Sequence, residues 1–522
     1  MKHRQAIRRT TPERRHFLKV AVGAAAAAAV FPGLAWTEPA AASVLIHSGS
    51  PGRRVPTNYI GLSYELAQLT EPAFFSPEHK DLILLFQQLS PSGLLRLGGN
   101  TSEFCWFQAP STPAPKLHVP PGELADNWMP HRLFAIQSEA IRSLAGFSRA
   151  TGWQAIYGLN FGNSTVERAA IEAAYVARTL GDRLAFFQIG NEPDFYRDAN
   201  NGTRTRGWDF DDYAREWIAF ADAITAAVPA ARFGGPDTGA SSDWVVRFGQ
   251  TVASRLGERL IALSGHYYAE GPPDDPSVTA TRLLAGDPNV AKSTRSIVEI
   301  ADAYDLAYHM TEGNSCYRGG KPGMSDAFAA ALWCADYVLL LASLGCAGVN
   351  LHGGDSRFLS AGLGDHNPGL DASSGKKPAA PNGFYTPIAS ELGQPVSPRS
   401  VFYGMLMAQQ FAGATMLSID LNAKGNLTAY AAQKEGRQLL AIFNKDETIG
   451  FSVSLTSDTP PRKAEAWWLA APSLDSITGV TPGGASMIGA GTWAPKAQRL
   501  QMSQGTTRLH LPPVTGALVF LD

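Results

Sequence analysis

Two glutamates, each at the end of an apolar, strand-like run, are the residues of this chain best placed to do chemistry. Glu192 ends one run in an Asn-Glu-Pro sequence, and Glu312 ends another. A pair of carboxyl groups on buried strands suits cleavage of a glycosidic bond, because one can protonate the leaving oxygen while the other attacks the sugar or activates water. A lone glutamate is ordinarily a solvated loop residue. The interpretation therefore depends on the two residues meeting at one site.

The segments around these glutamates alternate between short apolar runs and helical periodicity. Strands are predicted at residues 58–65, 93–100, 154–160, 184–190, 232–236, 260–268, 307–312 and 347–352. Helices are predicted at 78–89, 132–151, 164–180, 211–228, 243–253, 279–304, 325–344 and 400–412. This order predicts a parallel sheet, and eight strand–helix units fit a (β/α)8 TIM barrel, which takes ~250 residues or more. A doubly wound open sheet is the alternative, but no glycine-rich phosphate loop opens a helix.

Polar side chains follow the predicted strands at their carboxyl ends. They are Glu65, Asn100, Asn160, Glu192, Asp237, His266, Glu312 and His352. In a (β/α)8 barrel the active site lies at this face, with Glu192 on the fourth strand and Glu312 on the seventh. Burial and a negative neighbour would raise the pKa of Glu192, as suits a general acid, and leave Glu312 as the nucleophile. Arg96 either orients a catalytic glutamate from below or forms an ion pair inside the barrel.

The chain divides into four predicted parts. Residues 1–42 form a targeting segment, 43–56 form strands that join a later domain, 57–412 form the barrel, and 413–522 form a C-terminal β-sandwich. The sandwich is predicted from short alternating runs separated by turn residues. Residues 355–381, rich in Gly, Ser, Pro and Asp, follow the eighth strand as a connection long enough to be functional or disordered.

The first 42 residues are typical of a twin-arginine export signal. Arg14 and Arg15 precede a Phe-Leu-Lys sequence and a mildly apolar, alanine-rich stretch, although Glu13 stands where Ser or Thr is commoner. An uncleaved anchor or a disordered tail is the alternative. The apolar stretch is shorter than the ~20 residues a stable membrane span needs. We expect a periplasmic or secreted protein with no stable membrane span after processing.

Composition and cysteine spacing limit the function classes. The formal net charge of −2 argues against binding nucleic acid. None of the four cysteines has metal-ligand spacing, and no metal or organic cofactor is expected. Cys334 and Cys346 lie in apolar stretches typical of buried free thiols. The sequence leaves open whether Cys105 and Cys316 pair, and it leaves the oligomeric state open.

Beyond the two glutamates, four motifs resemble those of glycoside hydrolase family 79, which holds β-glucuronidases and heparanases. They are residues 95–104, 311–317, 323–326 and 348–354, and the resemblance covers about residues 61 to 387. It implies retaining hydrolysis of β-glucuronides, with Glu192 as acid/base and Glu312 as nucleophile.

The same resemblance implies residues that hold the glucuronate ring. They are Glu65, Asn191, Tyr267, Tyr317, His352 and Tyr385, with Tyr268 as the alternative to Tyr267. Neutral donors such as tyrosines satisfy a carboxylate without lowering the pKa of nearby glutamates as an arginine would. Each tyrosine or histidine could equally be an ordinary core residue, and residues 355–381 separate His352 from Tyr385.

The expected partner is a glucuronide or a glucuronate-containing oligosaccharide or polysaccharide. The sequence has no dense cluster of Lys and Arg of the kind that grips heparan sulfate. This favours an exo-acting β-glucuronidase over an endo-β-glucuronidase acting on glycosaminoglycans. A non-catalytic carbohydrate-binding protein on a degenerate barrel is the third possibility, and the presence of both glutamates argues against it.

Overall fold

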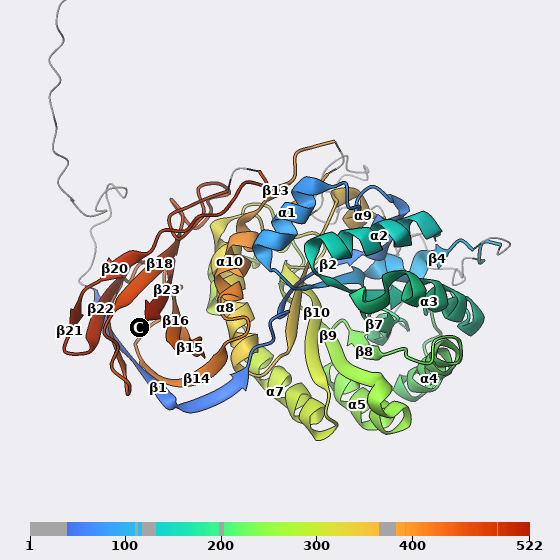
Figure 1. The fold of residues 1–522 in the computed structure, drawn as a ribbon, viewed down its shortest axis with the longest axis horizontal. Coiled ribbons are helices and arrows are strands. Elements are labelled where there is room, and N and C mark those ends of the chain that lie inside the picture. The colour runs from blue at the N-terminus through green and yellow to red at the C-terminus, as the bar shows by residue number, and fades with distance from the viewer. Residues whose placement is uncertain are drawn as a thin grey trace, which may run out of the picture. The chain divides into compact units, whose positions relative to one another are not determined.

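Eight parallel strands close into a barrel in the computed structural model (Figure 1). The structure describes residues 39–109, 113–116, 132–197, 203–364, 383–391, 393–487 and 489–522. The barrel strands, in order, are β2 (Ile60–Glu65), β3 (Leu94–Gly98), β6 (Gln154–Leu159), β7 (Leu184–Ile189), β8 (Phe233–Thr238), β9 (Leu260–Glu270), β10 (Ala307–Cys316) and β11 (Gly348–Gly353). The (β/α)8 prediction is confirmed, and the doubly wound alternative is wrong because β11 pairs with β2 and closes the sheet.

Helices follow the barrel strands and cover their outer faces. They are α1 (Lys80–Leu89), α2 (Ser138–Thr151), α3 (Val166–Leu180), α4 (Phe210–Ala227), α5 (Ser242–Leu256), α6 (Ala280–Ala285), α7 (Pro288–Ala303), α8 (Phe328–Ser343), α9 (Ser356–Ala361) and α10 (Ser400–Gln409). The segment 279–304, predicted to hold one or two helices, holds two, because Gly286 has a φ of +74° and Asp287 caps α7 with its side chain.

One predicted helix begins later than the sequence suggested. In place of the first residues of the helix predicted over 132–151, the structure has a short strand, β5 (Phe134–Ile136), which pairs in parallel with β4 (Cys105–Phe107). Phe134 and Ile136 are buried, and Ala135 between them is half-buried. This alternation is the period of a strand. A second small sheet pairs β12 (Ile388–Ala389) with β13 (Ser397–Pro398).

The C-terminal domain is a β-sandwich built from one sheet that covers both sides of a shared core. Its strands run in the order β19 (Thr481–Pro482), β18 (Ala464–Ala470), β23 (Thr515–Leu521), β16 (Arg437–Asn444), β15 (Leu427–Lys434), β14 (Thr415–Asn422), β1 (Ala40–Arg54), β17 (Phe451–Ser457), β22 (Thr506–Leu511) and β21 (Met502–Ser503), with β20 (Gln498–Leu500) beside β18. Aliphatic side chains from strands far apart in this order, such as Val44, Ile442, Val453 and Val519, pack in one cluster.

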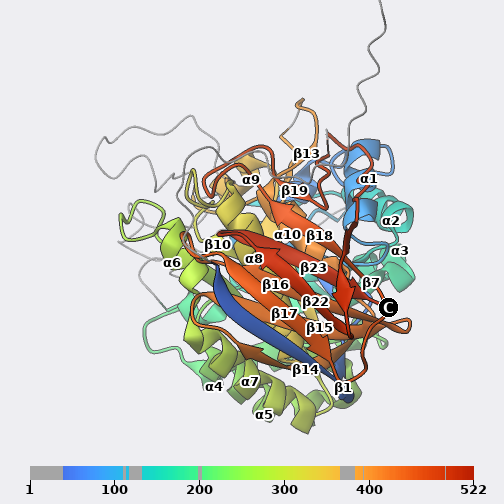
Figure 2. The same ribbon diagram turned by 90° about the vertical axis from the view of Figure 1, so that its left-hand side faces the viewer.

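The N-terminal strand lies within this sandwich rather than at its edge. β1 runs antiparallel to β14 on one side and parallel to β17 on the other, as Figure 2 shows for the blue strand among the orange and red ones. Sequence analysis expected one or two strands over residues 43–56, and the structure has a single strand with irregular register near Pro51.

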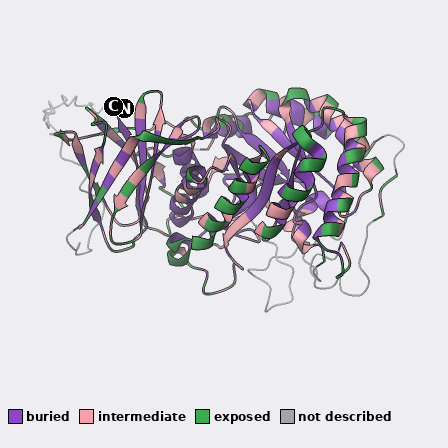
Figure 3. Cartoon of the chain, turned by 90° about the horizontal axis from the view of Figure 1, so that it is seen from below, coloured by how far each residue is buried: buried purple, intermediate pink, exposed green. Residues whose placement is uncertain are grey.

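Helices α8 and α10 both contact the sandwich, and α8 makes charged contacts with it. Most residues of α8 are buried, so its polar stripe is nearly lost, as expected of a helix covered on several sides. Asp336 accepts hydrogen bonds from Thr428 and Tyr430, and it forms an ion pair of 2.6 Å with Lys445. Figure 3 shows the barrel strands buried along their length while the helices around them expose their outer faces.

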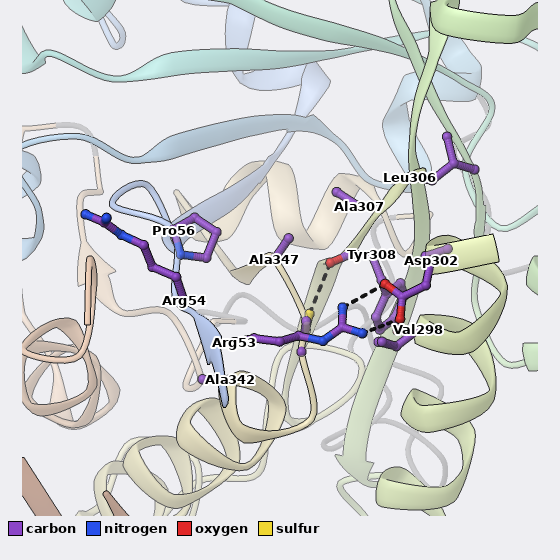
Figure 4. Close-up of a pocket in the computed structure, with 13 residues that line it drawn as sticks. Arg53, Arg54, Pro56, Val298, Asp302, Leu306, Ala307, Tyr308, Ala342 and Ala347 are labelled. Atoms are coloured by element: carbon purple, nitrogen blue, oxygen red, sulfur yellow. Dashed lines mark hydrogen bonds and ion pairs between the residues drawn. The ribbon is translucent and has the colours of Figure 1, made fainter. Parts of the chain in front are cut away.

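The connection from β1 into the barrel passes a cavity of about 200 Å³ at the amino-terminal ends of the strands (Figure 4). Arg53 pairs with Asp302 of α7 there, and the Sγ atom of Cys346 donates to the carbonyl of Tyr308. This cavity holds no glutamate pair, and in a (β/α)8 barrel features at this face serve stability.

All four cysteines are described, and each is a buried free thiol, which confirms the expectation for Cys334 and Cys346 and leaves Cys105 and Cys316 unpaired. Within the described residues, no helix combines the length and apolar character needed to cross a membrane. Residues 1–38 of the predicted export signal, and residues 365–381 of the segment after the eighth strand, lie outside the described residues, while Ala40–Ala42 of the predicted signal belong to β1.

Candidate active site

Glu192 stands just beyond the carboxyl end of β7 in a left-handed backbone conformation, with φ of +51°. Non-glycine residues adopt this conformation rarely, and strained backbone of this kind clusters at functional sites. The Glu192 amide donates to the carbonyl of Asp237 at 2.9 Å, which fixes the turn. A Cβ atom at Gly239 would lie 2.9 Å from the Glu192 carboxyl carbon, so only glycine leaves this side chain its place.

Glu312 lies on β10, at a bulge that interrupts the register between Met310 and Glu312. Such bulges redirect side chains beside active sites. Its Oε1 accepts a hydrogen bond of 2.8 Å from the hydroxyl of Tyr268, and its Oε2 accepts one of 2.5 Å from Nη1 of Arg96. Both carboxylate oxygens are therefore held in fixed positions before any substrate arrives.

The two glutamates face each other across the mouth of the barrel. An oxygen of Glu192 lies within 4.8 Å of an oxygen of Glu312. Retaining glycosidases place the two carboxyl groups about 5–5.5 Å apart, and inverting ones place them about 6.5–9.5 Å apart. The close approach of these two oxygens favours the retaining spacing, in which one carboxylate attacks the sugar directly.

The pKa values of the two glutamates are displaced in opposite directions. Burial raises the pKa of Glu192, and the charge of Glu312 adds to this, while a hydrogen bond from His266 opposes it. Burial would also raise the pKa of Glu312, but the charges of His352, His266 and Arg96 outweigh it and lower that pKa to about 2. One carboxyl is thus biased toward holding a proton and the other toward being ionised, which is the division of roles that acid and nucleophile need.

Arg96, on β3, is fully buried beneath the pair and connects most of the site. Its guanidinium donates to the side chains of Gln188, Ser63, Glu312, Asn191 and Asp237. Both roles suggested for Arg96 from the sequence are therefore present, because the same group that orients Glu312 also forms a buried ion pair with Asp237.

His266, on β9, bridges two carboxylates. Its Nδ1 lies 3.0 Å from Oε1 of Glu192, and its Nε2 lies 3.1 Å from Oδ2 of Asp237. Burial lowers the pKa of His266, but the charges of Asp237 and Glu312 outweigh this and raise it to about 10. Asp237 responds in the opposite sense: burial favours its neutral form, yet Arg96 and His266 hold its pKa well below the usual range.

Among the described residues, Glu192, His266 and Glu312 form a group with enough donor atoms for a metal ion. The chemistry of the donors does not fit one. Both nitrogens of His266 already face carboxylates, and the guanidinium of Arg96 occupies one oxygen of Glu312. A cation at this position would meet two positive groups, so the site is built for organic acid–base chemistry.

Glu65, His352 and Asn191 lie in the mouth beside this pair. Oε2 of Glu65 accepts hydrogen bonds from the amide and hydroxyl of Thr101, at 2.9 and 2.6 Å, while its Oε1 lies 3.6 Å from Nε2 of His352. His352 also lies 3.8 Å from Glu312 through Nδ1. The sequence-predicted residues Glu65 and His352 therefore come together with the nucleophile.

Asn191 is oriented by hydrogen bonds at both ends of its amide. Its Oδ1 accepts from Arg96 at 2.7 Å, and its Nδ2 donates to Oδ1 of Asn100 at 3.2 Å. One Nδ2 hydrogen remains beyond these two bonds, because an amide nitrogen carries two. The side chain can therefore donate to one further acceptor.

The predicted tyrosines differ in where the structure places them. Tyr385 is buried, with its ring 6.0 Å from that of His352 and 6.1 Å from that of Tyr268, and Tyr317 is half-buried with its ring edge-on to Tyr268. Tyr267 is a correction: it stacks on Tyr337 of α8 at 5.2 Å, on the opposite face of β9. Successive strand residues point to opposite faces, so Tyr268, which bonds Glu312, is the tyrosine that β9 contributes.

The sequence marks Asp237 and His266 as polar strand ends without indicating a role for either, and it favours Tyr267 over Tyr268 as a site residue. Strand alternation was the available signal for Tyr268, since His266 and Tyr268 share one parity on β9. No comparable signal marks Asp237, whose partners Arg96, Gln188 and Thr311 come from three other strands.

The fold and the site together define a (β/α)8 barrel with a β-sandwich and a pair of carboxylates at the carboxyl ends of the fourth and seventh strands. No protein-family model matches the chain. Two curated proteins named β-glucuronidase are similar in sequence: one from Aspergillus niger is 26% identical over 311 residues, and one from Neurospora crassa is 24% identical over 357 residues. The matches cover 55% and 60% of this chain and the same shares of the relatives, so the chain spans little more than half the length of the curated relatives it matches.

Solved structures share the architecture over nearly the whole chain. A 4-O-α-L-rhamnosyl-β-D-glucuronidase from Fusarium oxysporum superposes with a TM-score of 0.70 at 17% identity, covering 92% of this chain and 100% of that one. A GH51 arabinofuranosidase from Xanthomonas axonopodis pv. citri gives a TM-score of 0.63 at 16% identity, with coverage of 92% and 100%. At these identities the likeness concerns the fold.

Proposed function

We propose that this protein is a retaining β-glucuronidase in which Glu192 is the acid/base and Glu312 is the nucleophile. The observation that carries the proposal is the geometry of the pair, whose oxygens lie within 4.8 Å of each other at the mouth of the barrel. The opposite displacement of their pKa values supports the assignment of roles. The names of the two curated relatives support a β-glucuronide as the substrate class.

In the first step, a protonated Glu192 gives its proton to the glycosidic oxygen while an oxygen of Glu312 bonds to the anomeric carbon, and the aglycone leaves as the alcohol. Arg96 and Tyr268 hold the attacking carboxylate in place through its two oxygens. Fixed orientation of this kind lowers the barrier because little reorganisation is left for the transition state.

In the second step, Glu192 has become the base. It takes a proton from a water molecule, the water oxygen bonds to the anomeric carbon, and the ester bond to Glu312 breaks. Glucuronate is released with its original β configuration, because each step inverts the anomeric centre once. Glu192 regains its proton and the cycle closes.

Recognition of the sugar falls to the polar groups around the pair. The remaining Nδ2 hydrogen of Asn191 is available to the 2-hydroxyl, an interaction that strengthens as an oxocarbenium-like state forms. Oε1 of Glu65 keeps acceptor capacity for a ring hydroxyl, since both of its direct hydrogen bonds go to Oε2. We assign the uronate carboxylate to the end of the mouth lined by Tyr317 and Tyr385, where uncharged donors leave the pKa of Glu192 undisturbed.

The test is hydrolysis of an aryl β-glucuronide by the wild type and by Glu312→Gln, which keeps the shape of the side chain. Loss of an essential nucleophile lowers kcat by on the order of 10⁴-fold or more. Proton NMR of the wild-type reaction should show the β anomer of glucuronate first. Hydrolysis near the wild-type rate by the variant, or first appearance of the α anomer, would overturn the mechanism.

An aryl β-glucoside is the matched substrate control, because it differs from the glucuronide only in carrying a hydroxymethyl group in place of the carboxylate. Faster cleavage of the glucoside than of the glucuronide would sink the substrate assignment while leaving the two-carboxylate mechanism in place. A protein that binds glucuronides but cleaves neither substrate would be the non-catalytic carbohydrate-binding alternative.

We propose exo action, and the endo-acting alternative predicts a different product series. An exo enzyme releases monosaccharide from the non-reducing end, and its rate on heparosan depends weakly on chain length. An endo enzyme produces a ladder of oligosaccharides and acts poorly on short aryl glucuronides. Chromatography of early heparosan digests separates the two.

We also propose export through the twin-arginine route, on the Arg14-Arg15 pair and the alanine-rich stretch that follows it. Residues 1–42 fused to a reporter should direct it across the bacterial inner membrane. Replacing both arginines with lysine should retain the reporter in the cytoplasm, and unchanged export of that double variant would contradict the proposal.

A further inference from the structure

We propose that Asp237 is a positioning residue that keeps both nitrogens of His266 protonated, so that a fixed imidazolium beside Glu192 controls how readily this acid/base exchanges its proton. The inference rests on the proposed function, because it concerns the two proton transfers that Glu192 performs. Asp237 touches neither catalytic carboxylate through its own side chain and acts through His266.

The backbone delivers Asp237 to the centre of the barrel in an unusual way. It lies near the end of β8 at a break in the register between Pro236 and Thr238, and its φ is +66°. Bulges and left-handed backbone at a non-glycine residue are costly local features that occur where a side chain must be aimed. Asp237 is 1% exposed, so its carboxylate has no water to satisfy it.

Four donors surround the Asp237 carboxylate. Oδ1 accepts from Nε2 of Gln188 at 2.6 Å and from the hydroxyl of Thr311, and Oδ2 accepts from Arg96 and faces Nε2 of His266 at 3.1 Å. A protonated carboxyl would point its hydrogen at one of these donors. The arrangement therefore requires an ionised Asp237, and it is complete without solvent.

The enclosure of His266 leaves it little choice of protonation state. Its side chain is 0% exposed, and its two ring nitrogens face Asp237 and Glu192. A neutral imidazole donates from one nitrogen only, so the ring donates to both carboxyl groups only when it is an imidazolium. Nε2 also lies 3.5 Å from Nη2 of Arg96, but the Asp237 oxygen is nearer, at 3.1 Å. Oε1 of Glu192 can accept from Nδ1 even when the other oxygen of Glu192 carries the acid proton. The pKa of His266, raised to about 10 by Asp237 and Glu312 against the effect of burial, agrees with the geometry.

The groups that face this cluster come from every surrounding element. They are Arg96 on β3, Glu192 and Asp194 after β7, Tyr213 on α4, Tyr268 on β9, and Glu312 on β10. Asp194 is bound by the amides of residues 239–241, and Arg96 is shared between Asp237 and Glu312. His266 is the cation in direct contact with Glu192 in this set.

The consequence is a limit on the pKa of Glu192. Burial and Glu312 raise it, which favours the proton donor of the first step, and the imidazolium lowers it, which favours the base of the second step. Without Asp237 the imidazole would give up its proton at a lower pH. Glu192 would then face a neutral ring, and its pKa would rise.

The experiment follows the side-chain nitrogens of His266 by NMR in protein labelled with ¹⁵N-histidine, with His266→Gln used to assign the signals. In the wild type both nitrogens should keep imidazolium shifts through about pH 9, as two anionic neighbours require. In Asp237→Asn the midpoint should fall by about 1–3 pH units. Asp336→Asn, which breaks the buried pair with Lys445 away from the site, is the matched control and should leave His266 unchanged.

The kinetic readout is the pH profile on the aryl β-glucuronide. The basic limb of kcat/KM, which reports loss of the Glu192 proton, should move to higher pH in Asp237→Asn, with a larger loss in kcat than change in KM. A wild-type His266 that titrates near its ordinary value of about 6.5 overturns the inference without any variant. So does an Asp237→Asn protein whose His266 titration matches the wild type. Absence of wild-type hydrolysis would count against the proposed function alone, because the NMR titration does not use a substrate.

Discussion

The barrel mouth and the sandwich core are both buried, but the mouth is lined by charged side chains and the core is packed with apolar ones. The mouth encloses four charged side chains that are linked in series: Arg96 bonds Glu312 and Asp237, and Asp237 faces His266. Among the described residues of the sandwich, Lys445 is the one buried side chain with a charge, and it turns outward to Asp336 of α8. The sandwich core itself consists of aliphatic, aromatic and alanine side chains.

The apolar core of the sandwich supplies stability, whereas the charged side chains of the mouth supply reactivity. Apolar burial in the sandwich stabilises the fold without specifying any reaction. Buried charges in the mouth contribute little net stability, because the desolvation of each ion offsets the attraction between them. Their retention at the carboxyl ends of the strands is explained by the pKa values that they impose on Glu192 and Glu312.

Replacing Arg96, the cation at the centre of the mouth, should have the largest effect on stability and activity. Arg96→Met leaves Asp237 and Glu312 buried without their shared partner, and we expect a loss of about 3–5 kcal/mol in the free energy of unfolding together with loss of hydrolysis. Urea unfolding measures the first. Arg437→Met, at a partly exposed pair with Asp522, is the control and should cost about 0–1 kcal/mol. Equal stability of the two variants would contradict the proposed contrast.

A cavity in the sandwich should lower stability without touching the chemistry. Leu440→Ala on β16, at a fully buried position, should cost about 2–5 kcal/mol through lost burial and the space left behind. Below the unfolding transition, kcat and its pH profile should stay at wild-type values. A shifted pH profile would mean that the two regions are coupled and that the contrast between them is too simple.

Acid should weaken the mouth selectively. The pKa of Glu312 is lowered to about 2 in the folded protein, against about 4.3 for a glutamate in an unfolded chain. Its stabilising contribution is therefore present above about pH 4.3 and is lost as the pH falls toward 2, a change on the order of 3 kcal/mol. Urea unfolding at pH 6 and pH 3 should show this slope in the wild type and a shallower slope in Glu312→Gln.

The two tyrosines of β9 give the smallest and sharpest comparison. Tyr268→Phe removes the hydroxyl that bonds Glu312, and a lost hydrogen bond to a charged group is worth about 1.5–3 kcal/mol, or about 10–100-fold in kcat/KM. Tyr267→Phe keeps the stack on Tyr337 and should change activity by less than about twofold. Equal losses in both variants would show that the mouth extends to the outer face of the strand.

Much of this organisation follows from local patterns that the sequence displays. The barrel strands and their polar ends were predictable because a buried parallel strand is a short apolar run between helices, and the carboxyl end is where the next residue turns polar. Glu192 and Glu312 could be paired for the same reason. The helix prediction was wrong for the first residues of 132–151, because Phe134–Ile136 forms a strand that pairs with β4. No local sequence pattern reveals this contact.

The contacts of the charged network around Asp237 could not be predicted from the sequence. Asp237 depends on Gln188, Thr311, Arg96 and His266, each from a different strand, and its backbone conformation depends on a break in the β8 register. These contacts form only when the barrel closes and brings these strands together. Tyr267 and Tyr268 are adjacent on β9 and therefore point to opposite faces of the strand. Which of them points into the barrel depends on the exact start of β9.

The position of β1 constrains how the chain is made. Ala40 aligns with Phe451 and Ser43 with Asn422, so the earliest described strand waits for partners that are synthesised only after the whole barrel. Contacts so distant in sequence close slowly, and an unpaired strand is open to pairing with other chains in the meantime. A chain stopped after α10 would carry β1 without either of its partner strands. Pairing of β1 therefore cannot be completed before β14 and β17 have been synthesised.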